Sequence, residues 1–159
     1  MVEGVNTFLG VPYAAYLRAG RRFARPEEPE AWQGIRPALT HGPVCPQVPT
    51  YGPVGHGATS ALNAGEDCLT LNIRTQAPCG KAPVLVWVHG GGYAVGSANE
   101  TVLQSGACAV SGIVEVTLNY RLGVLGFLHL DDAPDNRGLL DIIRALQWVR
   151  DNVASFGGD

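Results

Sequence analysis

Two short apolar runs most strongly constrain how this chain can fold, and a glycine-rich segment follows the first of them. The run at 84–88 holds five apolar residues, and a histidine and three glycines follow at once at 89–92. Its β-branched and aromatic residues predict a strand covered on both faces. A helical pattern over 99–111 leads to a second β-rich run at 113–118. This order of strand, helix and strand predicts a βαβ crossover with two parallel strands.

The rest of the chain divides at residue 67. Residues 1–66 contain eight prolines and predict an irregular segment with only short extended pieces. Apolar and polar residues alternate over 69–74, which predicts a half-buried strand. An apolar stripe predicts a final helix over 137–154, placed to feed another strand. We therefore predict an incomplete α/β fold with a mostly parallel sheet, and interpret 1–159 as one partial domain with an irregular part (1–66) and an α/β part (67–159).

Charge and hydropathy exclude several classes of partner. Eleven basic against fourteen acidic residues give a net charge of −3, which argues against nucleic-acid binding and against an anionic membrane surface. No apolar run approaches the roughly 18 residues of a membrane span. The first ten residues lack both a basic start and an apolar block, so no secretory signal is expected.

The glycine run at 90–92 admits two interpretations. Three glycines in a row cost backbone entropy, so either a tight turn makes room for packing, or the backbone must approach a ligand closely. Ligands bind at the carboxyl ends of strands in open α/β sheets, and free N–H groups there can form an oxyanion hole. A dinucleotide-binding turn is disfavoured, because the spacing is not G-x-G-x-x-G and the predicted helix starts late.

The four cysteines, Cys45, Cys68, Cys79 and Cys108, include no C-x-x-C pair. No histidine stands at a metal-ligand spacing from them, so we expect no zinc site. From spacing alone, a bridge between Cys45 and Cys68 and two free thiols are equally open interpretations. Cys108 lies in an apolar stretch and is expected to be a small buried side chain.

Several longer motifs, taken together, resemble one family. They are F-L-G-V-P-Y-A at 8–14, G-P-V-C-P-Q at 42–47, E-D-C-L-T-L-N-I at 66–73, V-H-G-G-G-Y at 88–93, N-Y-R-L-G at 119–123, G-L-L-D at 138–141 and F-G-G-D at 156–159. Their content and order resemble the type-B carboxylesterases, which include the cholinesterases and the non-catalytic neuroligins. The resemblance implies an α/β-hydrolase fold, of which this chain covers about the first third.

The resemblance also assigns roles around the glycine run. It implies that the amides of Gly91 and Gly92 are two of the oxyanion donors. The third donor follows the nucleophilic serine, which this chain does not reach. His89 is then part of the oxyanion loop, where it supports the loop or lines the cleft together with Gly90. Tyr93 is expected to border the acyl pocket.

Further implications concern the frame of the site. The resemblance implies a disulfide between Cys45 and Cys68, and a structural ion pair between Glu66 and Arg121. It implies neither a metal nor an organic cofactor. The compartment stays unknown, although a bridged pair weakly favours secretion or another oxidising site. Glu115 stands in a strand that is apolar in the family, so its carboxylate must be paired or protonated.

No G-x-S-x-G elbow occurs in the 159 residues. A serine esterase also needs a base and an orienting acid, so we expect this chain alone to be inactive. The remainder of the hydrolase domain would supply them and act on a small-molecule ester. The alternatives are a non-catalytic, neuroligin-like interaction module and a decayed gene fragment.

Overall fold

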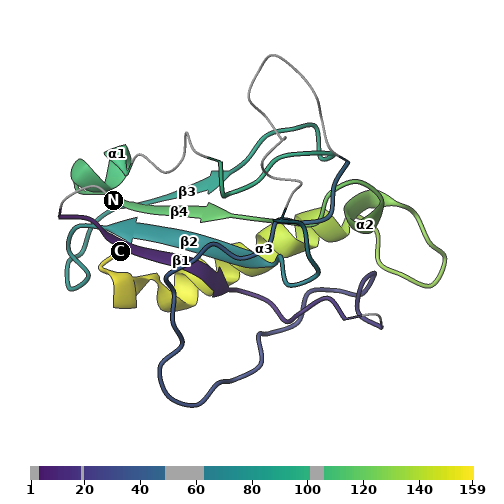
Figure 1. Cartoon of the computed structure of the whole chain (residues 1–159), viewed down its shortest axis with the longest axis horizontal. Coiled ribbons are helices and arrows are strands. Elements are labelled where there is room, and N and C mark those ends of the chain that lie inside the picture. Colours follow the sequence, from purple (N-terminus) through teal and green to yellow (C-terminus); the bar gives the residue numbers. More distant parts are fainter. Residues whose placement is uncertain (1–3, 19, 49–62, 101–105) are drawn as a thin grey trace.

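The computed structural model describes residues 4–18, 20–48, 63–100 and 106–159. A sheet in the order β1-β2-β4-β3 is flanked by the long helix α3 (Figure 1). Its strands are β1 (Asn6–Pro12), β2 (Thr70–Thr75), β3 (Val84–Val88) and β4 (Val114–Leu118). The described helices are α1 (Ala107–Val110), α2 (Gly123–Phe127), α3 (Arg137–Asn152) and the 3-10 turn η3 (Val153–Phe156).

The βαβ crossover is confirmed by the pairing of β3 with β4. These strands run parallel, with Val86 opposite Val116. The two remaining pairs, β1 with β2 and β2 with β4, are antiparallel. The described sheet is therefore mixed, and the expected parallel arrangement is limited to β3 and β4. β1 lies within the segment expected to be irregular, where it is one of the short extended pieces.

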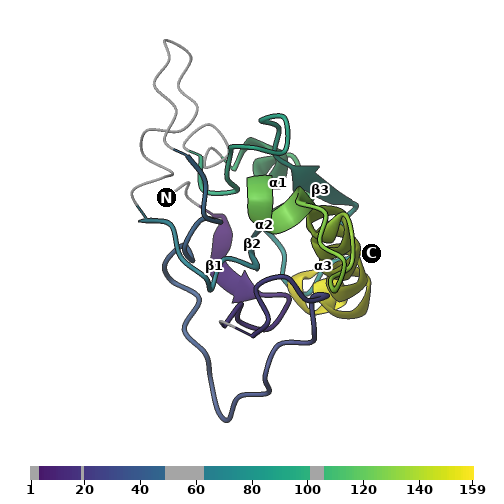
Figure 2. The same ribbon diagram turned by 90° about the vertical axis from the view of Figure 1, so that its right-hand side faces the viewer.

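One face of the sheet carries the apolar core. Alternate residues of β2 and β4, such as Ile73 and Val116, are fully buried there. The inner side of α3 packs on them with Ala145 and Val149, and Val153 of η3 extends the same cluster. Figure 2 shows α3 alongside the sheet from a second direction. The core thus fixes the strands against α3, which is the predicted helix over 137–154 apart from its last turn.

The opposite face of β2 is buried as well, so the prediction of a half-buried strand is wrong. The Asn72 amide donates to the carbonyl of Ala98 and to the Thr117 hydroxyl, both at 3.3 Å. Arg74 lies directly opposite Glu115 and pairs with its carboxylate at 3.4 Å. Polar side chains on this face are tolerated because they satisfy one another. The expectation that Glu115 must be paired is confirmed in the same contact.

β3 is more exposed than its apolar sequence predicts. Trp87 is 47% exposed, and Leu85 and Val88 are each 39% exposed. The prediction of a strand covered on both faces is wrong for the described chain, because β3 is the last strand in the sheet order. Gly158 forms a parallel bridge with Ala82, just before β3. The residues after η3 thus run parallel to the chain just before β3.

The helices differ from prediction in two places. The described part of the predicted helix over 99–111 is only α1, a single turn, and residues 101–105 lie outside the described residues. Cys108 in α1 is half-buried rather than buried. α2 was not predicted from periodicity, since a helix of five residues is too short to show one. No helix among the described residues is long and apolar enough to cross a membrane.

Candidate active site

The glycine turn lies at the carboxyl end of β3 and has an unusual backbone. Gly91 and Gly92 have φ values of 119° and 61°, and Tyr93 follows with φ 61°. A positive φ is costly for an aromatic residue and persists only where surrounding contacts impose it. At Gly91, an added Cβ would stand 1.9 Å from the carbonyl oxygen of Val95. Both glycines and Tyr93 are exposed, so the turn lies at the surface.

Hydrogen bonds in this turn are distributed unequally between carbonyls and amides. The Gly91 carbonyl accepts from the N–H groups of Ala94 (3.1 Å) and Val95 (3.2 Å). The Tyr93 carbonyl accepts from the Gly123 N–H at 2.7 Å. In contrast, the N–H groups of Gly91 and Gly92 donate to no other described residue. The bonded carbonyls anchor the turn, while these two amide donors have no partner among the residues that the structure describes.

His89 is buried next to this turn and contacts its backbone. Its ring is only 4% exposed and stacks on Tyr120, with ring centroids 4.6 Å apart. Nδ1 lies 2.8 Å from the Gly90 carbonyl, which can only accept, so Nδ1 carries the proton. Burial lowers the pKa of His89, which favours the neutral ring. The buried ring position fits the predicted supporting role, whereas Gly90 and Tyr93 are exposed.

Gln47 joins the turn to the disulfide loop, and motif matching gave it no role. Its Oε1 accepts from the Gly96 N–H at 2.9 Å, and its Nε2 donates to the Gly96 carbonyl at 2.9 Å. Nε2 also donates to the Cys45 carbonyl at 3.1 Å. Cys45 and Cys68 form a disulfide, as the resemblance implied. The signal for Gln47 was present in the G-P-V-C-P-Q motif, but only the structure shows what its amide holds.

The predicted pair of Glu66 with Arg121 is replaced by two other pairs. Arg121 forms an ion pair with Asp141 at 2.6 Å, and both side chains are fully buried. Glu66 pairs instead with Arg22, closer to the surface. The two pairs are linked, because the Arg22 carbonyl accepts from Arg121 at 3.1 Å. Asp141 on α3 supplies a fully buried carboxylate that balances the charge of the buried guanidinium, whereas the side chain of Glu66 is 31% exposed.

An apolar cavity of about 510 Å³ adjoins the turn. Ala94 and Val95, which follow the turn, form part of its wall, and Leu122 to Leu125 at the start of α2 form another. Pro46, Gln47 and Val48 close it from the disulfide loop. Tyr93 itself does not line this cavity; its ring contacts Phe127 at 4.9 Å. A hollow of this size and character suits an apolar part of a small molecule.

The other histidines of the described residues lie away from the turn, and His56 lies outside the described residues. Within the described ranges, no group of three or more His, Cys, Asp or Glu side chains could hold a metal ion. His129 pairs with Asp135 in an exposed loop, and His41 contacts Asn72 on the far part of the sheet. The described residues therefore bring together two backbone N–H groups without a described partner, the contacts that hold their turn, and an apolar hollow.

Comparisons with known proteins show which family the chain is similar to. The sequence model of the Carboxylesterase family matches residues 1–159. The para-nitrobenzyl esterase of Bacillus subtilis (strain 168) is 40% identical over 163 residues, covering 99% of this chain and 33% of that protein. A solved structure of a thermophilic PNB esterase superposes with a TM-score of 0.90 at 41% identity, covering 100% of this chain and 34% of that one. Neuroligin-2 of Mus musculus is 40% identical over 192 residues, covering 98% of this chain and 23% of that protein. The chain thus spans about a third or less of the length of these relatives.

Proposed function

Because this chain belongs to the carboxylesterase family, we propose that it supplies oxyanion donors to a serine ester hydrolase. A serine oxygen bonds to the ester carbonyl carbon and the alcohol leaves; water then releases the acid and restores the serine hydroxyl. The N–H groups of Gly91 and Gly92 stabilise the charge that develops on the carbonyl oxygen. What supports this proposal is the unequal bonding of the turn: the carbonyls of Gly91 and Tyr93 accept hydrogen bonds, while these two amides donate to no described residue.

The catalytic hydroxyl would come from polypeptide outside these 159 residues. No serine of this sequence stands in a G-x-S-x-G elbow, and the relatives are about three times as long. We therefore propose that the chain alone does not turn over esters. The remaining part of a hydrolase domain would add the nucleophile, its base and the third oxyanion donor.

The apolar cavity suggests where part of the substrate lies. It is built from residues that flank the turn, such as Val95, and from α2, such as Val124. An ester whose carbonyl oxygen meets the turn could place an apolar acyl or alcohol group there. The proposed substrate is accordingly a small-molecule ester with an apolar group next to the carbonyl.

A chimera tests the proposal. This chain replaces the matching segment of the Bacillus subtilis para-nitrobenzyl esterase, and hydrolysis of a p-nitrophenyl ester is measured. We expect turnover. We expect Gly91→Ala to lower kcat by about 10²–10³-fold, as much as the loss of an oxyanion donor, because its Cβ would stand 1.9 Å from the Val95 carbonyl oxygen and displace the turn that positions both amides. Gly92→Ala should lose less, since its Cβ meets no atom within 4 Å and only its φ is unfavourable. Gly20→Ala, also without a neighbour within 4 Å, is the control.

Three results would contradict the proposal. Full activity in Gly91→Ala would separate the turn from catalysis. A folded but inactive chimera would favour the interaction-module alternative, for which the similarity to neuroligin-2 is the supporting observation. Ester turnover by the 159-residue chain alone, abolished by a serine-directed phosphonate, would overturn its proposed inactivity.

The disulfide bears on where the protein acts. Cys45 and Cys68 are bridged and buried, and such bridges persist mainly in oxidising compartments. We propose secretion or another oxidising location on this ground. Alkylation of the free thiols in freshly isolated protein tests it. Labelling of Cys79 and Cys108 but not of the bridged pair is expected, because these two cysteines are free.

A further inference from the structure

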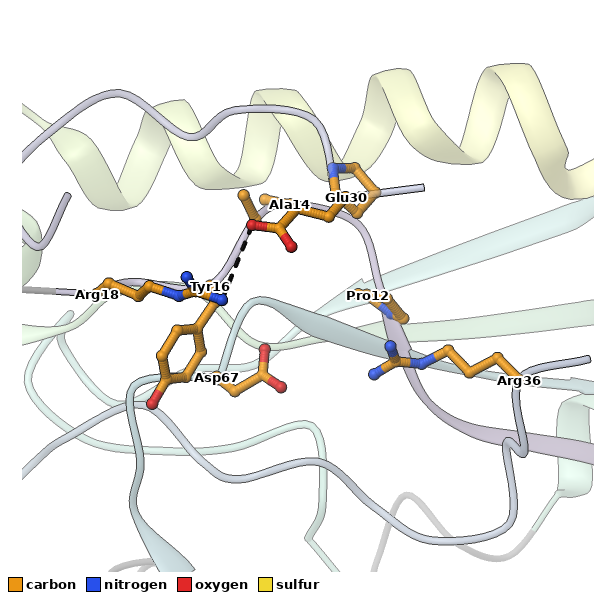
Figure 3. A pocket seen from close by; sticks show the side chains of 9 residues that line it. Pro12, Ala14, Tyr16, Arg18, Glu30, Arg36 and Asp67 are labelled. Carbon is orange, nitrogen blue, oxygen red and sulfur yellow. Dashed lines mark ion pairs between the residues drawn. The ribbon is translucent and has the colours of Figure 1, made fainter. Parts of the chain in front are cut away.

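A second cavity, polar in character and about 350 Å³ in volume, lies on the N-terminal segment (Figure 3). It shares no lining residue with the apolar cavity beside the glycine turn. Buried Pro12 and Ala14, at the end of β1 and just beyond it, form one wall. Charged side chains from three separate stretches of chain, around residues 18, 30–36 and 67, converge on it. Its size falls within the range of small-ligand sites.

The charges in this cavity are only partly paired. Arg18 and Glu30 form an ion pair at 3.9 Å, drawn as a dashed line in Figure 3. Arg36 enters from the opposite side, and its guanidinium lies 5.6 Å from the Trp32 ring. Neither Arg36 nor the half-buried Asp67 has an ion-pair partner among the described residues. Within the described chain, Arg36 and Asp67 therefore line the same hollow, and neither lies within ion-pair distance of an opposite charge.

We propose that this cavity binds a small zwitterion that carries both an ammonium and a carboxylate group, such as a free α-amino acid. The ligand carboxylate pairs with the Arg36 guanidinium, which offers a fork of donors suited to two oxygens. The ligand ammonium pairs with the Asp67 carboxylate. The proposal does not depend on the esterase activity proposed above, because the two sites share no residue.

Charge balance favours a zwitterion over a simple anion or cation. Arg18 and Arg36 together balance Glu30 and Asp67, so the cavity has no net charge with which to attract one sign. A simple anion at Arg36 would meet the repulsion of Asp67, and a simple cation at Asp67 would meet that of Arg36. A ligand with both groups satisfies both side chains at once. Because the cavity is open to solvent, the affinity should be weak, with a Kd on the order of 1 mM.

The test is an NMR titration of the full 159-residue chain, followed by backbone amide shifts. The probes are alanine, propionate and ethylamine, which carry both charges, the negative one and the positive one. Alanine should shift the amides around residues 14–18, 36 and 67, and bind at least about tenfold more tightly than either single-charge probe. Equal binding of propionate and alanine, or no shift at these amides, would overturn the proposal.

Two variants should change the preference instead of merely removing it. Asp67→Asn leaves Arg36 alone, so propionate should now bind at least as well as alanine. Arg36→Gln leaves Asp67 alone, so ethylamine should gain in the same way. A gain of binding cannot come from misfolding. Arg25→Gln, an exposed arginine outside the cavity, is the matched control and should retain the alanine preference. An unchanged preference in both cavity variants would contradict the proposed pairing.

Discussion

β3 and β4 are neighbouring parallel strands in which burial runs opposite to hydrophobicity. β3 reads Val-Leu-Val-Trp-Val and is largely half-exposed or exposed. β4 reads Val-Glu-Val-Thr-Leu and is buried throughout. The difference comes from position, because β4 lies between β2 and β3, whereas β3 has only one strand as a full partner. The burial of a strand is thus set by the elements next to it. The composition of the strand does not by itself predict its burial.

The carboxyl ends of the two strands also differ. After β4, Arg121 makes hydrogen bonds to Asp141, Arg22 and Ala24, so this end is tied to α3 and to the N-terminal segment. After β3, the chain enters the glycine turn, where the amides of Gly91 and Gly92 have no hydrogen-bond partner in the described part of the chain. The firmly bonded end of β4 lies beside the glycine turn after β3. The contacts of Arg121 can therefore hold the strands in place while the amides of the turn remain available.

The largest expected effect comes from breaking the frame at the end of β4. Asp141→Asn removes the charge that balances the fully buried Arg121. We expect the free energy of unfolding to fall by about 3–5 kcal/mol, because an uncompensated buried charge remains. Urea denaturation of the variant and of the unaltered chain measures the difference.

The matched control for this change is Asp132→Asn. Asp132 is exposed in the loop after α2 and makes no described ion pair. It should change the free energy of unfolding by less than about 0.5 kcal/mol. Similar losses in the two variants would mean that the buried pair does not hold the end of β4.

A second prediction compares the two strands directly at one cross-strand pair. Val86 of β3 lies opposite Val116 of β4. Val116 is fully buried and Val86 only partly. Val116→Ala should cost about 2 kcal/mol of stability, and Val86→Ala roughly 1 kcal/mol, since less apolar area is lost there. Denaturation of both variants under the same conditions is the measurement. Equal costs would show that β3 is as well packed as β4.

This comparison also shows how far the sequence could predict the molecule. The α/β class, the crossover and α3 followed from periodicity and from the apolar runs, because these depend on local pattern. The exposure of β3 and the full burial of β2 did not, because they depend on which elements lie next to each strand.

The site divides in the same way. Motifs placed Gly91 and Gly92 at a strand end and paired Cys45 with Cys68, as the structure also does. The pairing of Glu66 with Arg121 was wrong, because Asp141 is distant in sequence and only the docking of α3 brings it to the guanidinium. The two hydrogen bonds between the Gln47 amide and the backbone of Gly96 could likewise not be predicted from the sequence.

A third prediction concerns the exposed side of β3. An exposed apolar edge strand is prone to pair with other chains, so we expect the isolated chain to self-associate. Trp87→Lys places a charge where the side chain is 47% exposed. It should lower the sedimenting fraction, although losing the buried half of the indole should also cost on the order of 1 kcal/mol of stability. Unchanged self-association would mean that the chains associate through another surface, for example the one around the exposed Ile143 of α3.

The smallest expected effect is the contribution of His89, the buried residue directly after β3, to the pH dependence of stability. Burial lowers the pKa of His89, so as the pH falls below about 6.5 the unfolded chain binds a proton that the folded chain resists, and stability falls. Burial raises the pKa of Glu115 and of Asp141, which acts in the opposite direction. The slope of the unaltered chain mixes these effects, but its difference from His89→Gln isolates the histidine. Between about pH 7 and about pH 5.5, His89→Gln should lose less stability than the unaltered chain, and an equal loss would mean that His89 accepts a proton in place.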